Sequence, residues 1–232
     1  MVAFYGHLVA TRKEFAKPYV PGYVLDRIKT KGDVATAGIV PISWARMAGW
    51  SSLAETPPDT FWRSLVGNRN ATGQRAPFHW GQICTTAFAR RAVGQDLETS
   101  EAIRHGCPDP IRVFPERVQS VVWSRRLIRL ERFDDLGLTA KQAKKGDLLC
   151  ILKGCSVPVV LREFVDGVRA AASGCADSLG HFHEVSPADV AERQLRVHYE
   201  FIGEAYIHGL MDGEAADRRA AMLIPPHSFL LR

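Results

Sequence analysis

The chain lacks the features that mark several common classes of protein. No apolar run approaches the roughly 20 residues that a membrane-spanning helix needs. The first residues, up to Glu14, do not place an apolar core after a basic start, as a signal peptide would. The motifs GxxxxGK[ST], GxGxxG, GxSxG and HExxH do not occur. The sequence therefore predicts a cytoplasmic protein without a membrane partner, and it supports none of the chemistries that these motifs carry.

Cysteine is scarce and is not arranged for disulfides or metal binding. The five cysteines are irregularly spaced, and no CxxC pair is present. Cys150 lies in the apolar run 148–152, where a free thiol behaves as a small hydrophobic group. Cys155 follows a predicted turn without a recognisable base beside it, so a catalytic thiol is not expected. The pattern predicts reduced thiols in a cytoplasmic protein. The five are Cys84, Cys107, Cys150, Cys155 and Cys175.

Positive charge is in modest excess but is not concentrated in one place. The net charge is +5, from 30 Lys and Arg against 25 Asp and Glu. The densest group of arginines runs from Arg125 to Arg132, and it alternates with Leu127, Ile128 and Leu130. This alternation is typical of the polar face of a strand, whereas a nucleic-acid site needs clustered basic side chains. The sequence disfavours nucleic-acid binding, which is kept as a second alternative.

The composition and periodicity predict one integrated α+β domain. The chain has 232 residues with 46% hydrophobic content, enough to bury a substantial core. Residues 1–115 are predicted to be mainly helical and to pack on a small antiparallel β-barrel or curled sheet of five to six strands. Apolar residues at helical spacing predict helices over these ranges: 42–50, 61–66, 80–93 and 96–105.

Residues 116–232 are predicted to be rich in β-structure. Residues 114–123 are left open between helix and strand, and residues 163–195 are predicted to form a long surface insertion because large apolar residues are few there. The run 148–152 and the following run 157–161 predict a hairpin, in which Pro158 places the second strand at an edge or a bulge. Further strands are predicted over these ranges: 126–133, 197–201 and 228–231.

The segment 203–215 holds the densest group of titratable side chains. Its structural interpretation is a bulge at Gly203, a glycine turn, and a helix whose N-cap is Asp212. Its chemical interpretation is a ligand-binding or enzymatic site built from Glu204, Tyr206, His208 and Asp212, in which Glu204 and His208 form an acid–base pair. No nucleophile or oxyanion loop accompanies the pair, so the structural interpretation is favoured.

Neither a metal nor a cofactor is predicted. His181 and His183 lie on the same side of an extended segment, but a metal site needs a third or fourth ligand and none is suitably spaced. The interpretation is a solvated loop.

Several short motifs occur in an order that resembles a known family. The chain resembles the C-terminal region of fungal heterokaryon-incompatibility (HET-domain) proteins over roughly residues 60–232. The motifs that carry the resemblance are Phe61-Trp62-Arg63-Ser64-Leu65, a basic strand, Gly137-Leu138, Gly146-Asp147, Gly154, Val157-Pro158-Val159-Val160-Leu161-Arg162, and Gly203-Glu204-Ala205-Tyr206-Ile207-His208-Gly209-Leu210-Met211-Asp212-Gly213-Glu214. Within these motifs the structural positions are Phe61, Trp62, Arg63, Gly146, Asp147, Gly154, Pro158, Arg162, Gly203, Gly209 and Gly213.

The resemblance implies a role in non-self recognition and in the fungal cell-death response that follows cell fusion. The family's effector module carries an N-terminal motif of the ALSYVWG type, and residues 1–60 do not contain it. No catalytic residue is therefore carried over. The resemblance implies a non-enzymatic accessory domain that recognises another protein; the first alternative is a ligand-binding or enzymatic barrel that uses the segment 203–215.

Overall fold

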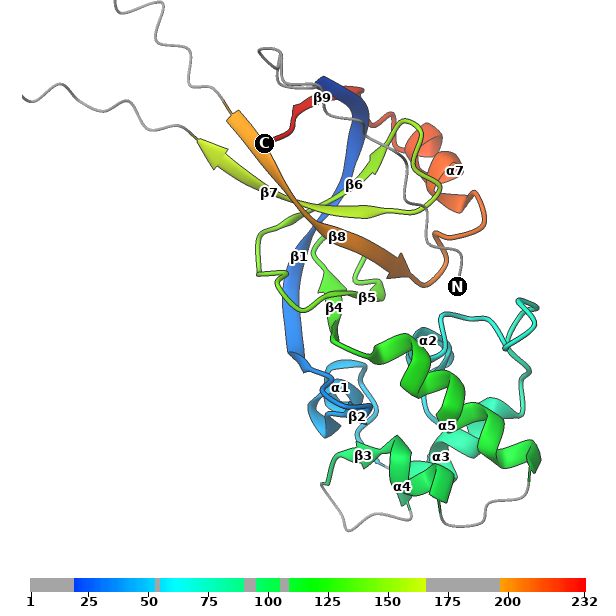
Figure 1. The fold of residues 1–232 in the computed structure, drawn as a ribbon. Helices are drawn as coiled ribbons and strands as arrows, with labels where there is room; N and C mark the ends of the chain where they lie inside the picture. Colours follow the sequence, from blue (N-terminus) through cyan, green and yellow to red (C-terminus); the bar gives the residue numbers. More distant parts are fainter. Residues whose placement is uncertain (1–18, 53–54, 90–94, 105–108, 166–196) are drawn as a thin grey trace, which may run out of the picture.

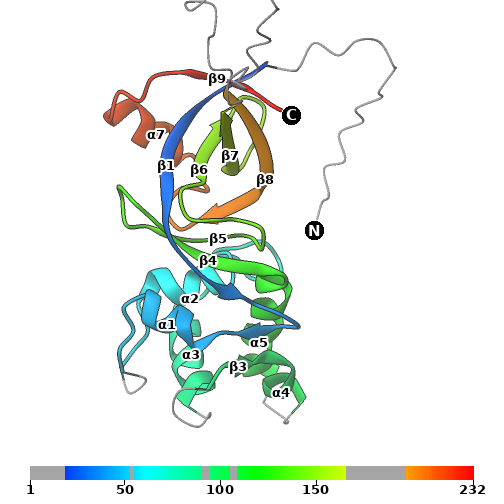
Figure 2. The ribbon, with the colours of Figure 1, turned by 90° about the vertical axis from the view of Figure 1, so that its left-hand side faces the viewer.

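A computed structural model describes residues 19–52, 55–89, 95–104, 109–165 and 197–232. Helices and one large antiparallel sheet confirm the predicted α+β class. Figures 1 and 2 show the first five helices gathered at one end of that sheet. Cys107, Cys175, His181 and His183 lie outside the described residues, as does the predicted insertion from residue 166 onward.

The main sheet has seven strands rather than the predicted five to six. Its order is β4-β5-β8-β7-β6-β1-β9, and an additional pairing of β1 with β4 curls the sheet so that distant strands meet. The strands are β1 (Tyr19–Val34), β4 (Arg125–Leu130), β5 (Leu136–Ala140), β6 (Leu148–Leu152), β7 (Val159–Val165), β8 (Val197–Ile207) and β9 (His227–Leu230).

The strand β1 lies in the part of the chain that was predicted to be mainly helical. It pairs with three strands, β9, β6 and β4, and its register shifts three times along the way. At the first shift the buried carboxylate of Asp26 accepts the backbone N–H groups of Arg132 and Phe133, at 3.0 and 3.1 Å. These bulges interrupt the two-residue alternation by which a strand is recognised in a sequence. The prediction for residues 1–115 is wrong in this respect.

Five helices pack around one aromatic core at the lower end of the sheet in Figure 1. Trp44, Phe61, Trp62, Phe88 and Phe114 are fully buried there. A two-stranded sheet of β2 (Ile39–Val40) and β3 (Leu97–Glu98) lies among the helices. The helices are α1 (Ile42–Met47), α2 (Asp59–Leu65), α3 (Trp80–Ala89), α4 (Thr99–Arg104) and α5 (Asp109–Val122).

The change from helices to strands occurs later than the predicted boundary at residue 115. The helix α5 continues to Val122, and it buries Val118 and Val122 on one face. Residues 114–123 had been left open, and the helical interpretation holds for most of them. No helix in the described part of the chain is long and apolar enough to cross a bilayer.

The predicted hairpin is present as β6 and β7, with Leu148 opposite Leu161 and Cys150 opposite Val159. Its turn contains Gly154, whose φ of 92° favours glycine. The prediction for this strand was an edge or a bulge. The strand β7 lies between β6 and β8, so it is not an edge, and a register shift between Val160 and Leu161 gives it a bulge. Pro158 is tolerated because it precedes the strand, and its carbonyl accepts the N–H of Ala205 at 2.8 Å.

The predicted bulge at Gly203 is confirmed. The register between β7 and β8 shifts after the pair Val160–Gly203. A Cβ atom at position 203 would lie 2.8 Å from the Cβ of Ala140, so the close approach of β5 requires glycine. The strand β8 continues beyond the bulge to Ile207.

Candidate functional site

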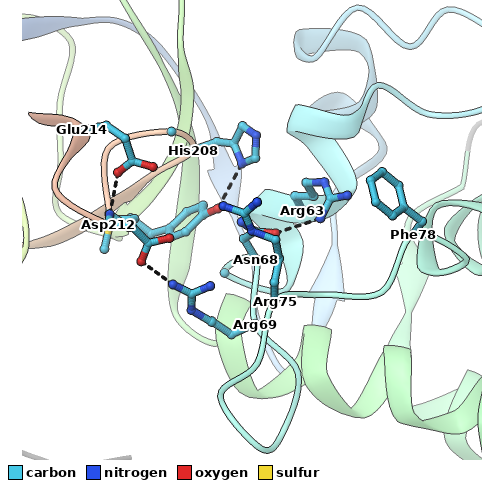
Figure 3. A pocket seen from close by; sticks show the side chains of 12 residues that line it. Arg63, Asn68, Arg69, Arg75, Phe78, His208, Asp212 and Glu214 are labelled. Atoms are coloured by element: carbon cyan, nitrogen blue, oxygen red, sulfur yellow. Dashed lines mark hydrogen bonds and ion pairs between the residues drawn. The ribbon is translucent and has the colours of Figure 1, made fainter. Parts of the chain in front are cut away.

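A cavity of about 460 Å³ lies where the helical end of the molecule meets the sheet. One wall is α2 and the loop that follows it, and the other is the end of β8 with the turn into α7 (Glu214–Ala221). Figure 3 shows side chains from both walls directed toward one another. The lining residues are Arg63, Gly67, Asn68, Arg69, Arg75, Phe78, Tyr206, His208, Gly209, Met211, Asp212 and Glu214.

The loop after α2 is shaped by its own polar groups. Gly67 and Asn68 take positive φ values of 60° and 50°, and the Asn68 N–H donates to the carbonyl of Arg63 at 2.7 Å, which ends the helix. Arg69 and Arg75 then face each other in an isolated β-bridge. Between them the Asn70 side chain accepts the N–H groups of residues 72 and 74 and so tightens the turn. The loop thus places two arginines on the same wall of the cavity.

Arg63 forms the inner end of this wall and is almost fully buried. Its guanidinium donates to Asp59 Oδ2 at 3.2 Å and to Asn68 Oδ1 at 2.9 Å. Its Cζ atom lies 4.2 Å from the centre of the Trp62 ring and 4.8 Å from that of Phe78. Phe78 is itself 82% exposed. An aromatic ring is therefore held at the rim of the cavity with one face supported by a cation and much of its surface open to water.

Tyr206 and His208 lie on the opposite wall and contact each other. The Tyr206 hydroxyl is 3.2 Å from His208 Nδ1. Burial raises the pKa of the Tyr206 hydroxyl, so this group stays protonated near pH 7 and shares a hydrogen bond with Nδ1. Burial, and then the positive charge of Arg63, lower the pKa of His208, so its ring is neutral near pH 7. In the tautomer whose Nδ1 accepts from Tyr206, the proton of the neutral ring is on Nε2, and that nitrogen is a donor.

Asp212 serves a different purpose from the predicted N-cap. The N-cap of α7 is Gly213, with a φ of 103°, and no side chain caps the helix. The left-handed residue turns Asp212 away from the first turn, and its carboxylate pairs with Arg69 across the cavity. The Asp212 N–H donates to Glu214 Oε2 at 2.6 Å. The predicted cap is therefore wrong, and Asp212 belongs to the cavity.

Glu204 does not join the other three residues. Its side chain lies at a separate hollow, beside Trp123, Arg125 and Phe201. Residues 204 and 208 are four positions apart on extended chain, which separates them by about 13 Å at a rise of about 3.3 Å per residue. The predicted acid–base pair of Glu204 and His208 is therefore not formed. Three of the four predicted side chains do converge on one cavity.

The arginines between residues 125 and 132 do not form one continuous surface. Arg125 lines the hollow that contains Glu204, and Arg132 lines another hollow near the end of α7. Arg129 pairs with Asp134 and donates to the carbonyl of Met47 at 2.8 Å. These arginine side chains contact different parts of the molecule. They do not form the continuous basic surface that binding a phosphate backbone requires.

Most of the family-motif residues lie in the core or in turns rather than in the cavity. Phe61 and Trp62 are buried, and Asp147 is buried against Arg162, with oxygen-to-nitrogen distances of 2.8 Å. Gly146, Gly209 and Gly213 have φ values of 89°, 79° and 103° in turns. The parts of the motifs that reach the cavity are Arg63 and, from the motif 203–214, the residues Tyr206, His208, Gly209, Met211, Asp212 and Glu214.

Sequence reasoning missed Arg69, Arg75 and Phe78. The run Gly67-Asn68-Arg69-Asn70-Ala71-Thr72-Gly73-Gln74-Arg75 contains the residues of tight turns together with two arginines. Loops held between two regular elements often carry binding residues, so this run was the available signal. Its proximity to Asp212, 143 positions away, follows only from the fold.

The side chains that line the cavity limit the chemistry that can be assigned to it. Its lining, within the described residues, contains no serine, threonine, cysteine or lysine that would serve as a nucleophile. Both of its acids are engaged, Asp212 by Arg69 and Glu214 by a backbone N–H group. Across the described ranges, no three side chains of the types His, Cys, Asp or Glu are grouped as a metal site requires.

The lowered pKa of His208 predicts that folding stability depends on pH. Its ordinary value is 6.5, and the folded state holds the proton less tightly than the unfolded chain. The stabilisation is complete above the unfolded-state pKa and is lost as the pH falls through the lower folded-state pKa. We expect the His208→Gln variant to lose less free energy of unfolding than the wild type between about pH 7 and pH 5. Urea unfolding, followed by tryptophan fluorescence at several pH values, measures how the free energy of unfolding of each protein depends on pH. An equal dependence in the wild type and the variant would contradict the lowered pKa of His208.

Comparison of the chain with known protein families, with curated protein sequences and with solved structures gave no significant match.

Proposed function

We propose that this chain is a non-enzymatic recognition domain whose cavity binds a ligand with a carboxylate group next to an aromatic or apolar group. The observation that carries the proposal is the set of three guanidinium groups around the neutral Tyr206–His208 pair. Guanidinium groups bind carboxylates through paired hydrogen bonds. A carboxylate is presented either by a free organic acid or by an acidic residue or chain terminus of a partner protein.

Arg75 is the arginine of the cavity that is available for a ligand. Arg63 is engaged with Asp59, and Arg69 with Asp212. Within the described residues, no acidic side chain forms an ion pair with Arg75. Arg75 and His208 line the same cavity, and the positive charge of Arg75 adds to the lowering of the pKa of His208 after larger contributions from burial and Arg63. The Arg75 guanidinium thus offers donors to an anionic group bound in the cavity that His208 also lines.

Phe78 supports the second half of the proposal. Its ring is 82% exposed at the rim of the cavity, so an apolar or aromatic group of a ligand can cover it. Removing apolar surface from water contributes roughly 25 cal/mol per Å². A ligand with an aromatic ring and a carboxylate would therefore use both the exposed ring and the free guanidinium.

The resemblance to the C-terminal region of HET-domain proteins suggests where such recognition would be used. In that setting the ligand is a feature of another protein, and its binding contributes to non-self recognition after cell fusion. The resemblance supports this wider role, whereas the cavity supports the chemistry of the ligand.

The proposal predicts that Arg75→Gln weakens the binding of a carboxylate probe. N-Acetylphenylalanine is a suitable probe, and its affinity is expected in the millimolar range, because small ligands of this size gain about 0.3 kcal/mol per heavy atom. Loss of one charged hydrogen bond at an exposed site costs about 1 kcal/mol, which is about a fivefold loss of affinity. Nuclear magnetic resonance titration of the wild type and the variant measures this change.

Two controls accompany the titration. Arg46→Gln removes an exposed arginine outside the cavity and is expected to leave the affinity unchanged. N-Acetylphenylalanine amide has the same ring without the negative charge, and it is expected to bind more weakly than the acid and to be insensitive to Arg75→Gln. The proposal is contradicted if the amide binds the wild type as tightly as the acid does, or if Arg75→Gln has no effect.

A further inference from the structure

An ion pair inside the cavity joins its two walls. Arg69, on the loop after α2, pairs with Asp212, on the turn before α7. Both residues line the cavity, and their side chains are 33% and 41% exposed. Figure 3 shows the contact crossing from one wall to the other. Arg69 is therefore occupied by a carboxylate of the chain itself, in the position where an anionic group of a ligand would otherwise reach it.

Each partner of the pair is fixed through its backbone. The Arg69 carbonyl accepts the Nε–H of Arg117, on α5, at 2.9 Å. The Asp212 N–H donates to the Glu214 carboxylate at 2.6 Å. Holding two long side chains in one geometry is the main cost of a surface ion pair, and a fixed backbone lowers that cost. These backbone hydrogen bonds hold the carboxylate of Asp212 in its position in the cavity.

We propose that Asp212 determines the charge of the ligand, acting as an internal competitor for Arg69 so that the cavity accepts a single negative charge and rejects a doubly charged phosphate. The inference rests on the proposed function of the cavity. A singly charged carboxylate reaches Arg75 without disturbing the pair. A phosphate dianion needs more than one cation, and it must approach the fixed carboxylates of Asp212 and Glu214. Removing the charge of Asp212 frees Arg69 to bind it.

The Asp212→Asn variant tests the inference with two probes, N-acetylphenylalanine and phenyl phosphate, titrated at about pH 7.5, where a phosphate monoester carries close to two charges. We expect the wild type to prefer the carboxylate. The variant is expected to gain about tenfold in affinity for phenyl phosphate. Its affinity for the carboxylate is expected to change by less than about threefold, because that group binds Arg75.

Matched variants separate this mechanism from a general change in charge. Asp217→Asn makes the same charge change on an exposed part of α7, outside the cavity, and it is expected to leave both affinities unchanged. Asp212→Ser is a second way to free Arg69 and should reproduce the gain in phosphate affinity. Because the pair is substantially exposed, neither substitution at position 212 is expected to unfold the protein.

The two arms of the experiment report on different proposals. Failure of the wild type to bind N-acetylphenylalanine would reject the proposed function, while the phosphate arm still decides the role of Asp212. A variant at position 212 that remains folded but gains no phosphate affinity overturns the inference. So does an equal gain in Asp217→Asn.

Discussion

Replacing Arg162 with methionine is expected to lower the free energy of unfolding by about 3–5 kcal/mol, because it leaves a buried carboxylate without its counter-ion. Asp147 is only 4% exposed, and Arg162 donates to both of its oxygens at 2.8 Å. After the substitution the Lys144 N–H group, at 2.7 Å, is the remaining donor among the contacts described. One backbone N–H does not compensate for burying a full negative charge.

A double variant distinguishes the buried charge from a simple loss of packing. In Asp147→Asn with Arg162→Met the charge is gone, while the amide oxygen still accepts the Lys144 N–H group. The double variant is expected to be more stable than Arg162→Met alone. Glu116→Ala breaks the exposed pair of Glu116 with Arg112 and should cost no more than about 0.5 kcal/mol. Urea unfolding curves measure the free energy of unfolding of each variant. If Arg162→Met loses as little free energy of unfolding as Glu116→Ala, the buried charge of Asp147 does not depend on Arg162.

Replacing Arg63 with methionine is expected to cost about 2–4 kcal/mol of folding stability, because it removes one buried and two partly buried hydrogen bonds at once. The guanidinium holds Asp59, Asn68 and the carbonyl of Ala76, the last at 3.2 Å. Methionine retains part of the packing against Trp62 but offers no donor to that buried carbonyl.

The same substitution is expected to weaken ligand binding in the cavity. The loop after α2 loses the side chain that fixes its beginning and its end, at Asn68 and Ala76, so the positions of Arg69 and Arg75 are no longer held. We expect Arg63→Met, under conditions in which it is still folded, to bind N-acetylphenylalanine more weakly than the wild type. Arg46→Met is the exposed control and should stay within about 0.5 kcal/mol of the wild type in stability. Unchanged stability and unchanged binding in Arg63→Met would contradict both statements.

The parts of the fold that the sequence predicted are those with a local cause. The hairpin of β6 and β7 is specified by two apolar runs around Gly154. The start of β8 is specified by alternation from Val197, and its bulge by Gly203. In each case the pattern lies within about ten residues, the length of chain over which strand periodicity is informative.

The long strand β1 could not be identified in this way. It contains Pro21, Gly22 and Gly32, residues that are depleted in strands. Gly22 is required by a distant contact, since a Cβ atom there would lie 2.3 Å from the carbonyl oxygen of Ile151. The strand also pairs with three partners, and its register shifts once within the pairing with β6 and twice within the pairing with β4. The residues of β1 are therefore determined by contacts with its partner strands, and they do not show a simple alternation of polar and apolar side chains.

The sequence allowed only one of the two walls of the candidate site to be predicted. Tyr206, His208 and Asp212 stood out because titratable side chains were concentrated between glycines. The N-cap role expected for Asp212 was wrong, because Gly213, with its positive φ, is the N-cap and Asp212 pairs with Arg69, whereas the ligand-binding role stays a prediction. The other half of the site comes from the loop after α2, and its approach to residue 212 depends on how the helical end packs against the sheet.

The central claim is that the two walls of this cavity form a binding site for a carboxylate next to an aromatic group. A crystal structure of the chain with N-acetylphenylalanine tests it most directly. The predicted result places the carboxylate of the probe within hydrogen-bond distance of the Arg75 guanidinium and its ring against Phe78, with Asp212 still paired to Arg69. Occupation of the hollow beside Trp123 and Phe201 instead, or an empty cavity at probe concentrations well above the measured dissociation constant, would contradict it.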